Sequence, residues 1–235
     1  MQILWNRILN FLESMAIKDR IDEVKSKLKP GTQLLAVSKY HPKEAIQEAY
    51  DTAGQRLFAE SHAQELVGKY EALPKDIKWH FIGHLQTNKV KYIVPFVELI
   101  HSVDSEHLLA EIDKQAKKVG RVVKCLLEVH IAEEETKYGF SFDEVKALYD
   151  SNALTKYENV EVVGLMGMAT ATDDKEQIKH EFEQLSSFYH SAQLTFAPKF
   201  TELSMGMSGD YEIATLLGST LVRVGSFIFG NRVYN

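Results

Sequence analysis

Apolar extended segments alternate with helical patterns along nearly the whole chain. The eight extended segments are 34–39, 56–61, 78–83, 97–104, 123–130, 160–169, 201–208 and 219–230. Helical patterns lie between or after them, at 42–53, 62–71, 86–93, 105–118, 141–149, 173–191 and from Asp210 onward. Continuously apolar segments are typical of parallel strands that are covered by helices. Eight such units predict an α/β fold, namely a (β/α)8 barrel.

The length of the chain leaves little room for anything besides this barrel. Barrels of this kind take about 250 residues, and the chain has 235. We therefore predict one domain overall, with a barrel over 31–235 and an amino-terminal helical segment over 1–30 that packs on it.

The amino-terminal segment carries two apolar stripes at helical spacing. The first consists of Leu4, Ile8, Phe11, Leu12 and Met15, and the second, in a different phase, of Ile17, Ile21, Val24 and Leu28. The change of phase has two interpretations. Residues 1–14 are an addition translated from an upstream start codon, or they are the first part of a kinked native helix.

Composition and charge exclude several classes of function. The formal net charge is −6 and no long block of lysine or arginine occurs, which argues against a surface for nucleic acid or anionic membranes. No apolar run approaches the roughly 20 residues that span a bilayer, and the start of the chain lacks the features of a signal peptide. Cys125, the only cysteine, lies in an apolar run and is expected in the core. A cytoplasmic protein without disulfides fits these features.

Lys39 is the first residue that suggests chemistry. It follows the apolar run "LLAVS" at the end of the first predicted strand, and sites in such barrels lie at the carboxyl ends of the strands. Partial burial there would lower the pKa of its ammonium group, and a neutral amine can attack an aldehyde or ketone. The alternative is an ordinary surface lysine at a strand end.

The ends of the seventh and eighth predicted strands are rich in small residues. The seventh ends in "SMGMSGD" and the eighth contains "VRVGSF", with Gly225 and Ser226. Barrels commonly bind phosphate with the loops after strands seven and eight, because backbone N–H groups approach an anion closely where side chains are small. We predict a phosphate site here, against the simpler alternative of two glycine-containing turns.

Arg223 stands inside the apolar run "TLVRVGSFI". An unpaired guanidinium group would be costly there, so a carboxylate or a ligand atom should pair with it. A lysine for a carbonyl, small residues for a phosphate and a buried arginine for a ring atom together describe a site for pyridoxal 5′-phosphate, PLP.

The histidines do not indicate a metal site. His80 and His84 are four residues apart, a spacing that pairs zinc ligands on a helix, but the segment is predicted to be strand and turn. We expect His80 to pack or form hydrogen bonds near the barrel mouth, and we predict no metal.

Six motifs together resemble the pyridoxal-phosphate homeostasis protein family, over roughly residues 16–232. In chain order they are "LLAVSK", "WHFIGHLQTNK", "ETKYGF", "GLMGMAT", "LSMGMSGDYEIA" and "GSTLVRVGSFIFG". The resemblance implies the fold of the amino-terminal barrel of alanine racemase. It also implies that Lys39 carries PLP as an internal aldimine, a Schiff base with the lysine itself.

The resemblance also implies roles for the other cofactor residues. Ser204 and Ser208, with the Gly225–Ser226 turn, would hold the phosphate. Arg223 would face the pyridine nitrogen and keep it unprotonated, which makes the ring a weaker electron sink.

Three positions depart from the family pattern. Ser61 stands in place of a usual asparagine, His84 in place of proline and His130 in place of asparagine. These departures concern the polar contacts around the ring, for which Ser61 and His80 are the candidates in this chain.

The expected function is a PLP carrier in vitamin B6 homeostasis rather than an enzyme. Alanine racemase takes a second acid–base group from an additional β-domain, which is not expected here after strand eight, so we assign no catalytic residue. PLP-dependent apoenzymes are the expected recipients, and the protein is expected to be a monomer. Two alternatives stay open, a weak PLP-dependent racemase and an aldolase-like barrel whose lysine binds a sugar phosphate directly.

Overall fold

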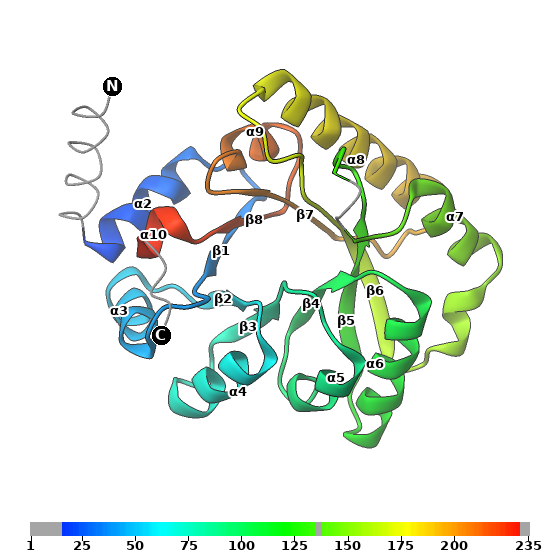
Figure 1. Cartoon of the computed structure of the whole chain (residues 1–235), viewed down its shortest axis with the longest axis horizontal. Coiled ribbons are helices and arrows are strands. Elements are labelled where there is room, and N and C mark those ends of the chain that lie inside the picture. The colour runs from blue at the N-terminus through cyan, green and yellow to red at the C-terminus, as the bar shows by residue number, and fades with distance from the viewer. Residues whose placement is uncertain (1–15, 135–137, 231–235) are drawn as a thin grey trace.

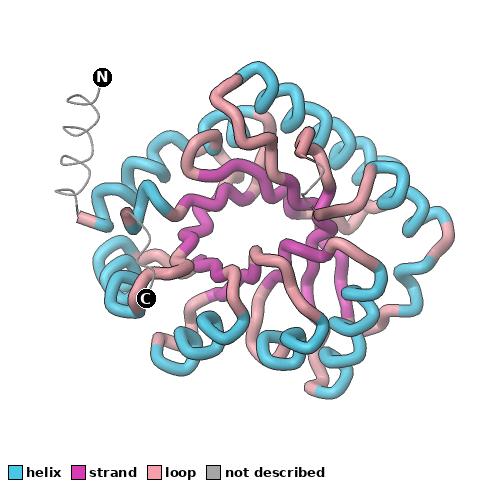
Figure 2. The backbone as a smooth tube through the Cα atoms, viewed as in Figure 1, coloured by secondary structure: helices cyan, strands magenta, loops and turns pink. Residues whose placement is uncertain are grey.

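The computed structural model describes residues 16–134 and 138–230. Its eight parallel strands form one closed barrel in chain order, with β8 paired to β1, and helices surround it (Figures 1 and 2). The strands are β1 (Gln33–Val37), β2 (Leu57–Glu60), β3 (Lys78–Phe81), β4 (Leu99–Val103), β5 (Val123–Val129), β6 (Val160–Gly167), β7 (Glu202–Met207) and β8 (Leu221–Val224). The predicted (β/α)8 barrel is confirmed.

The helices connect these strands on the outside of the barrel (Figure 1). They are α2 (Ile17–Lys27), α3 (Lys43–Ala53), α4 (Ala63–Ala72), α5 (Thr87–Ile93), α6 (Glu106–Lys118), α7 (Phe142–Asp150), α8 (Lys175–Thr195), α9 (Tyr211–Leu216) and α10 (Ser226–Phe229), with a 3-10 turn, η1, at Ala153–Lys156. Each predicted helical pattern corresponds to one of these helices within a few residues.

Local sequence signals account for several helix ends. Ser141 and Glu144 form a capping box at the start of α7, which satisfies two backbone N–H groups that have no partner within the helix. The Ser105 side chain caps α6 by accepting one such N–H group. Helix α3 ends at Gly54, whose φ of 61° is a left-handed conformation that glycine adopts without steric cost.

The core has two layers, one on each side of the strands. The larger layer lies between strands and helices and includes Phe58, Trp79 and Phe182. A smaller cluster of Leu99, Leu126 and their neighbours joins side chains of β4, β5, β6 and β8. This division follows from strand geometry, since successive side chains point to opposite faces.

One predicted strand is too long. The sequence predicts extended structure over 219–230, but β8 ends at Val224 and residues 226–229 form α10. Gly225 marks the change, because a Cβ atom there would lie 2.8 Å from the Val37 carbonyl oxygen of β1. The Gly225 carbonyl then accepts the N–H groups of Ile228 and Phe229, which turns the apolar residues after it into a short helix.

The amino-terminal segment is described from Ala16 onward. The second apolar stripe forms α2, with Ile17, Ile21 and Val24 buried, and α2 contacts α3 and α10. The first stripe and the question about residues 1–14 lie outside the described residues, and the boundary at residue 30 stays a prediction. No helix in the described ranges is both long enough and apolar enough to span a bilayer.

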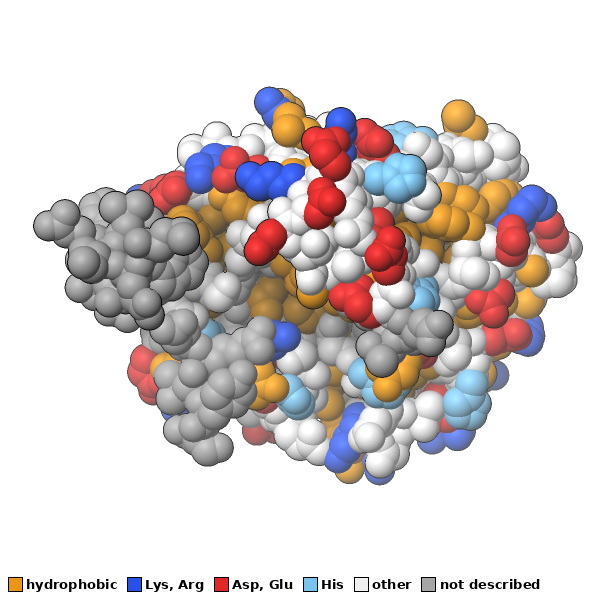
Figure 3. All heavy atoms as spheres, turned by 45° about the horizontal axis from the view of Figure 1, so that its top comes forward, with side chains coloured by type: hydrophobic (Ala, Val, Ile, Leu, Met, Phe, Trp, Pro, Cys, Tyr) orange, Lys and Arg blue, Asp and Glu red, His pale blue; other side chains and the backbone are white. Residues whose placement is uncertain are grey.

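The surface carries mixed charge. On the face in Figure 3, lysine and arginine side chains are spread among acidic ones and form no continuous basic area. This distribution agrees with the net charge of −6.

Candidate functional site at the barrel mouth

Five of the predicted site residues line one cavity of about 250 Å³. They are Lys39, Ser208, Arg223, Gly225 and Ser226, and they follow or belong to β1, β7 and β8. The remaining walls come from Val37, His41, Ile82, Met166, Met168, Met207 and Gly209. The cavity is smaller than the roughly 300–1,000 Å³ typical of pockets for drug-sized ligands, and suits a ligand with a single ring.

Lys39 lies in a turn rather than at the end of the strand. Strand β1 ends at Val37, and the His41 N–H donates to the Ser38 carbonyl oxygen at 3.0 Å. Tyr40, directly after the lysine, has a φ of 65°, a conformation that is uncommon for residues other than glycine. The lysine is half-buried and contributes to the wall of the cavity.

Arg223 is buried, and neutral oxygens accept its hydrogen bonds. Its Nη1 donates to Ser204 Oγ at 2.7 Å and its Nη2 to the Gly167 carbonyl oxygen at 3.0 Å. Burial lowers the pKa of the guanidinium to about 10, although nearby Asp210 and Glu128 act in the opposite direction. Arg223 therefore stays charged at neutral pH and supplies a fixed donor at the cavity.

Ser204 lies beneath Arg223 and is not on the cavity wall. It is fully buried, and its hydroxyl group is used by Arg223 and, at 2.9 Å, by His101 Nδ1. This position differs from the phosphate contact that the family resemblance implies for Ser204. The reason is strand geometry, because Ser204 is in the middle of β7 whereas Ser208 follows its end.

A series of hydrogen bonds runs from Ser204 through the barrel interior. His101 Nε2 lies 2.9 Å from His80 Nδ1. Burial lowers the pKa of His80 to about 3 and that of His101 well below its usual value, so both rings are neutral. Because a guanidinium group only donates, Ser204 Oγ accepts from Arg223. The directions of the hydrogen bonds between Ser204 and His101 and between His101 and His80 depend on which ring nitrogen of each histidine carries the proton.

His80 is therefore not at the barrel mouth, which corrects the sequence-based expectation. It lies within β3, and it lines a second cavity of about 220 Å³ together with Lys78 and Lys124. These two lysines are at or near the starts of β3 and β5, the opposite end of the barrel from Lys39. No sequence pattern pointed to His101, which joins His80 to Ser204 and Arg223.

The three residues that depart from the family pattern lie outside the mouth cavity. Ser61 and His84 line a separate crevice of about 380 Å³, where Gly83 approaches the Ser61 backbone so closely that a Cβ atom would lie 2.2 Å from its carbonyl oxygen. The His84 ring stacks on Tyr138, and His130 Nε2 lies 3.0 Å from the Glu134 carbonyl oxygen.

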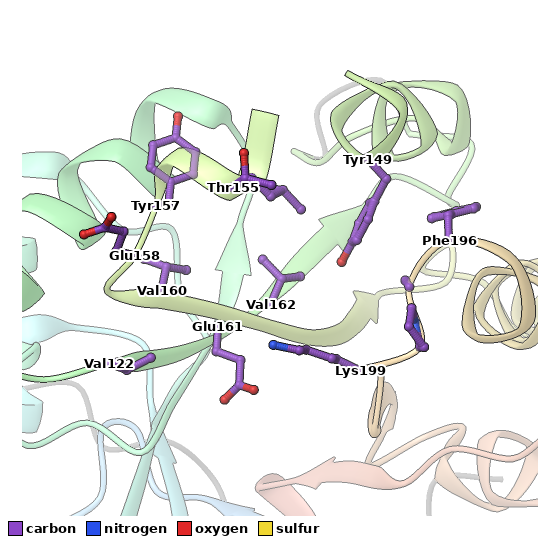
Figure 4. Close-up of a pocket in the computed structure, with 13 residues that line it drawn as sticks. Val122, Tyr149, Thr155, Tyr157, Glu158, Val160, Glu161, Val162, Phe196 and Lys199 are labelled. Carbon is purple, nitrogen blue, oxygen red and sulfur yellow. The ribbon is translucent and has the colours of Figure 1, made fainter. Parts of the chain in front are cut away.

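A larger cavity, of about 670 Å³, lies elsewhere (Figure 4). It lies along the start of β6, between the Tyr149 ring of α7 and residues 196–199 before β7. Its walls are mainly apolar, and none of the predicted site residues contributes to them. Size alone therefore does not mark a functional site, and the predicted reactive groups gather in the smaller cavity at the barrel mouth.

Comparisons with known proteins agree with the fold. The family described as alanine racemase, N-terminal domain, matches residues 12–233. A pyridoxal phosphate homeostasis protein of Aquifex aeolicus is 41% identical over 203 residues, which cover 86% of this chain and 88% of that protein. A protein of the same name from Homo sapiens is 36% identical over 215 residues, with 86% and 78% covered.

Solved structures give the same result. PipY of Synechococcus elongatus, in a structure described as having PLP bound, superposes with a TM-score of 0.82 and 36% identity, over 91% of this chain and 100% of that one. An alanine racemase of Clostridium difficile, 15% identical, has a TM-score of 0.75 over 93% of this chain and 60% of that one, and it shows the shared fold alone. The chain belongs to the pyridoxal phosphate homeostasis protein family, with a barrel of the alanine racemase amino-terminal type.

Proposed function

We propose that the chain binds PLP in the mouth cavity, with a covalent bond to Lys39. The observation that carries the proposal is that Lys39, Arg223 and the small residues after β7 and β8 line one cavity. The neutral Lys39 amine would attack the aldehyde carbon of the cofactor, and loss of water would leave a C=N bond to Nζ.

The remaining lining residues suit the other parts of the cofactor. Ser208, Gly225 and Ser226 are small and polar enough to let a phosphate approach their backbone and hydroxyl groups. The Ser208 hydroxyl group accepts the Gly225 N–H at 3.2 Å, which ties the two loops together. Arg223 would donate to the pyridine nitrogen, and Ser204 would hold Arg223 in place rather than contact the phosphate. Ser61 and His80 do not line this cavity, and direct ring contacts are not proposed for them.

The proposed role is to hold and release the cofactor without turnover. Racemisation needs two acid–base groups on opposite faces of the substrate carbon. Lys39, His41 and Arg223 are the titratable residues among those that line the cavity, and Arg223 stays protonated, so the carrier role requires that His41 does not act as the second group. The names of the relatives support homeostasis as the role. Delivery to PLP-dependent apoenzymes, a monomeric state and a cytoplasmic location belong to the same proposal.

His41 supports one alternative function, a weak PLP-dependent racemase. It lines the cavity and its ring lies 5.3 Å from that of Phe229, so it is the one candidate among the lining residues for a second proton donor. A weak PLP-dependent racemase would use Lys39 and His41.

The test combines absorption spectroscopy with a search for turnover. The purified protein with added PLP should show a visible Schiff-base band that is absent from Lys39→Ala, and it should not interconvert D and L amino acids. Absence of the band in the wild-type protein would contradict the proposed site. Racemisation that Lys39→Ala and His41→Phe both abolish would replace the carrier role with the enzymatic alternative.

A further inference from the structure

A buried ion cluster lies directly beside the turn that carries Lys39. It consists of Glu60 at the end of β2 and of Glu65 and Lys69 in α4. The side-chain exposures are 0% for Glu60, 23% for Glu65 and 8% for Lys69. Charged groups this far from water need partners. Glu60 Oε1 and the Lys69 ammonium have them, Glu60 Oε2 has none among the described residues, and the partners of Lys69 include the backbone of the Lys39 turn.

All three N–H groups of the Lys69 ammonium have acceptors. Lys69 Nζ lies 2.7 Å from Glu60 Oε1, 2.7 Å from Glu65 Oε1 and 2.8 Å from the Ser38 carbonyl oxygen. The Ser38 hydroxyl group donates to the same Glu60 oxygen at 2.6 Å. An ammonium group has three donors, so this geometry uses all of them within the cluster.

The cluster holds the chain on both sides of Lys39. On one side Lys69 binds the Ser38 carbonyl oxygen, and on the other the Tyr40 N–H donates to Glu65 Oε1 at 2.7 Å. Tyr40 adopts a φ of 65°, which a non-glycine residue keeps only when its surroundings impose it. The Tyr40 ring also lies 5.2 Å from the ring of His62, directly before α4. The peptide groups next to Lys39 are thus fastened to α4.

We propose that Glu65 and Lys69, together with Glu60, are positioning residues that orient Lys39 toward the cavity and so favour its bond to the PLP aldehyde. This inference rests on the proposed function, since it concerns the same lysine and the same cofactor. It assigns different roles to two neighbouring lysines, Lys69 and Lys39. Lys69 is held by three oxygens and supports the backbone, whereas Lys39 is presented to the ligand.

The most informative variant is Glu65→Ala. It removes the acceptor of the Tyr40 N–H but leaves the pair of Lys69 and the fully buried Glu60, so the fold should persist. Glu65→Gln keeps an oxygen that can accept this N–H and serves as the conservative variant. Glu71→Ala, an exposed position on the same helix, is the matched control.

The first readout does not involve the cofactor. Hydrogen exchange of the Tyr40 amide, followed by NMR, should be about tenfold or more faster in Glu65→Ala, and close to the wild-type rate in Glu65→Gln and Glu71→Ala. Unchanged exchange in Glu65→Ala would show that the cluster does not hold the turn, and would overturn the proposal.

The second readout separates positioning from general damage to the site. Affinity is measured for PLP and for an analogue with a methyl group in place of the aldehyde, which cannot bond to lysine. Glu65→Ala should weaken PLP binding about tenfold and change binding of the analogue less than about twofold, and Glu65→Gln should restore most of the loss. Equal losses for both ligands, or no loss for either, would overturn the proposal. If wild-type protein binds both ligands equally or neither, the covalent site fails instead, while hydrogen exchange still tests the cluster.

Discussion

At the scale of single residues, the surroundings of each charged group decide its chemistry. Lys39 and Lys69 are both near the barrel mouth, yet Lys69 has three oxygen partners while Lys39 lines the cavity. Arg223 similarly owes its direction to Ser204 and Gly167. From sequence, Lys39 and Arg223 stood out as charged residues in apolar runs. Their supporting residues did not, because Ser204, Glu65 and Lys69 are far from them in the chain.

Replacement of Ser204 by alanine tests the hydrogen-bond chain. The change leaves Arg223 Nη1 and His101 Nδ1 without their shared partner in the barrel interior. A buried group without its partner costs about 1–3 kcal/mol, so urea unfolding should show a loss of that size. Ser191→Ala, at an exposed position of α8, should change the free energy of unfolding by less than about 0.5 kcal/mol. Equal stabilities of the two variants would contradict the hydrogen bonds of Ser204 to Arg223 and His101.

Glu128 gives the protein a pH dependence with a definite sign. It is 5% exposed, and burial with nearby Asp104 raises the pKa of its carboxyl group to about 7, although Arg223 acts in the opposite direction. A raised pKa means that folding favours the protonated form. Its contribution to stability is therefore complete below about pH 4.5 and is lost as the pH rises toward 7. Each tenfold difference in proton affinity between the folded and unfolded states corresponds to about 1.4 kcal/mol.

Comparison with Glu128→Gln isolates this effect. Because glutamine does not titrate, the variant should gain stability relative to the wild type as the pH rises from about 4.5 to 8. Urea unfolding at several pH values measures the difference. A difference that stays constant over this range would show that Glu128 has an ordinary pKa in the folded protein.

At the scale of the elements, the ends of the strands position the residues that line the mouth cavity. Glycine decides the geometry at Gly225, where β8 passes so close to Val37 of β1 that a Cβ atom has no room. The sequence predicted the strands well because their apolar runs are continuous. It failed at 226–229, since a serine and three apolar residues after a glycine are compatible with a strand or a helical turn. What decides between them is the contact with β1.

Two glycines of the same cavity form a matched pair. Gly225→Ala places its Cβ atom 2.8 Å from the Val37 carbonyl oxygen, whereas nothing lies within 4 Å of a Cβ atom at Gly209. The first variant should lose about 1–3 kcal/mol of stability through overpacking, and the second should change by less than about 1 kcal/mol. Thermal and urea unfolding of both variants measure this. A loss in Gly209→Ala as large as in Gly225→Ala would contradict the close approach of β8 and β1.

At the scale of the whole molecule, closure of the barrel brings distant segments together. Lys39, Ser208 and Arg223 meet because β8 pairs with β1 and with β7. The eightfold alternation predicted this closure and hence which strand ends meet. It did not predict the series of hydrogen bonds from Arg223 through Ser204 and His101 to His80. These hydrogen bonds depend on the register between strands, which apolar runs alone do not specify. For the same reason His80 was expected at the wrong end of the barrel.

Borohydride reduction followed by peptide mapping tests whether Lys39 binds the cofactor covalently. Reduction converts the C=N bond into a stable secondary amine, so that the modified lysine is retained through proteolysis. After incubation with PLP, the label should be found on the peptide that contains Lys39. It should be absent from Lys39→Ala and remain on Lys39 in Glu71→Ala. A label on Lys69 or another lysine, or no label after saturation with PLP, would contradict the account.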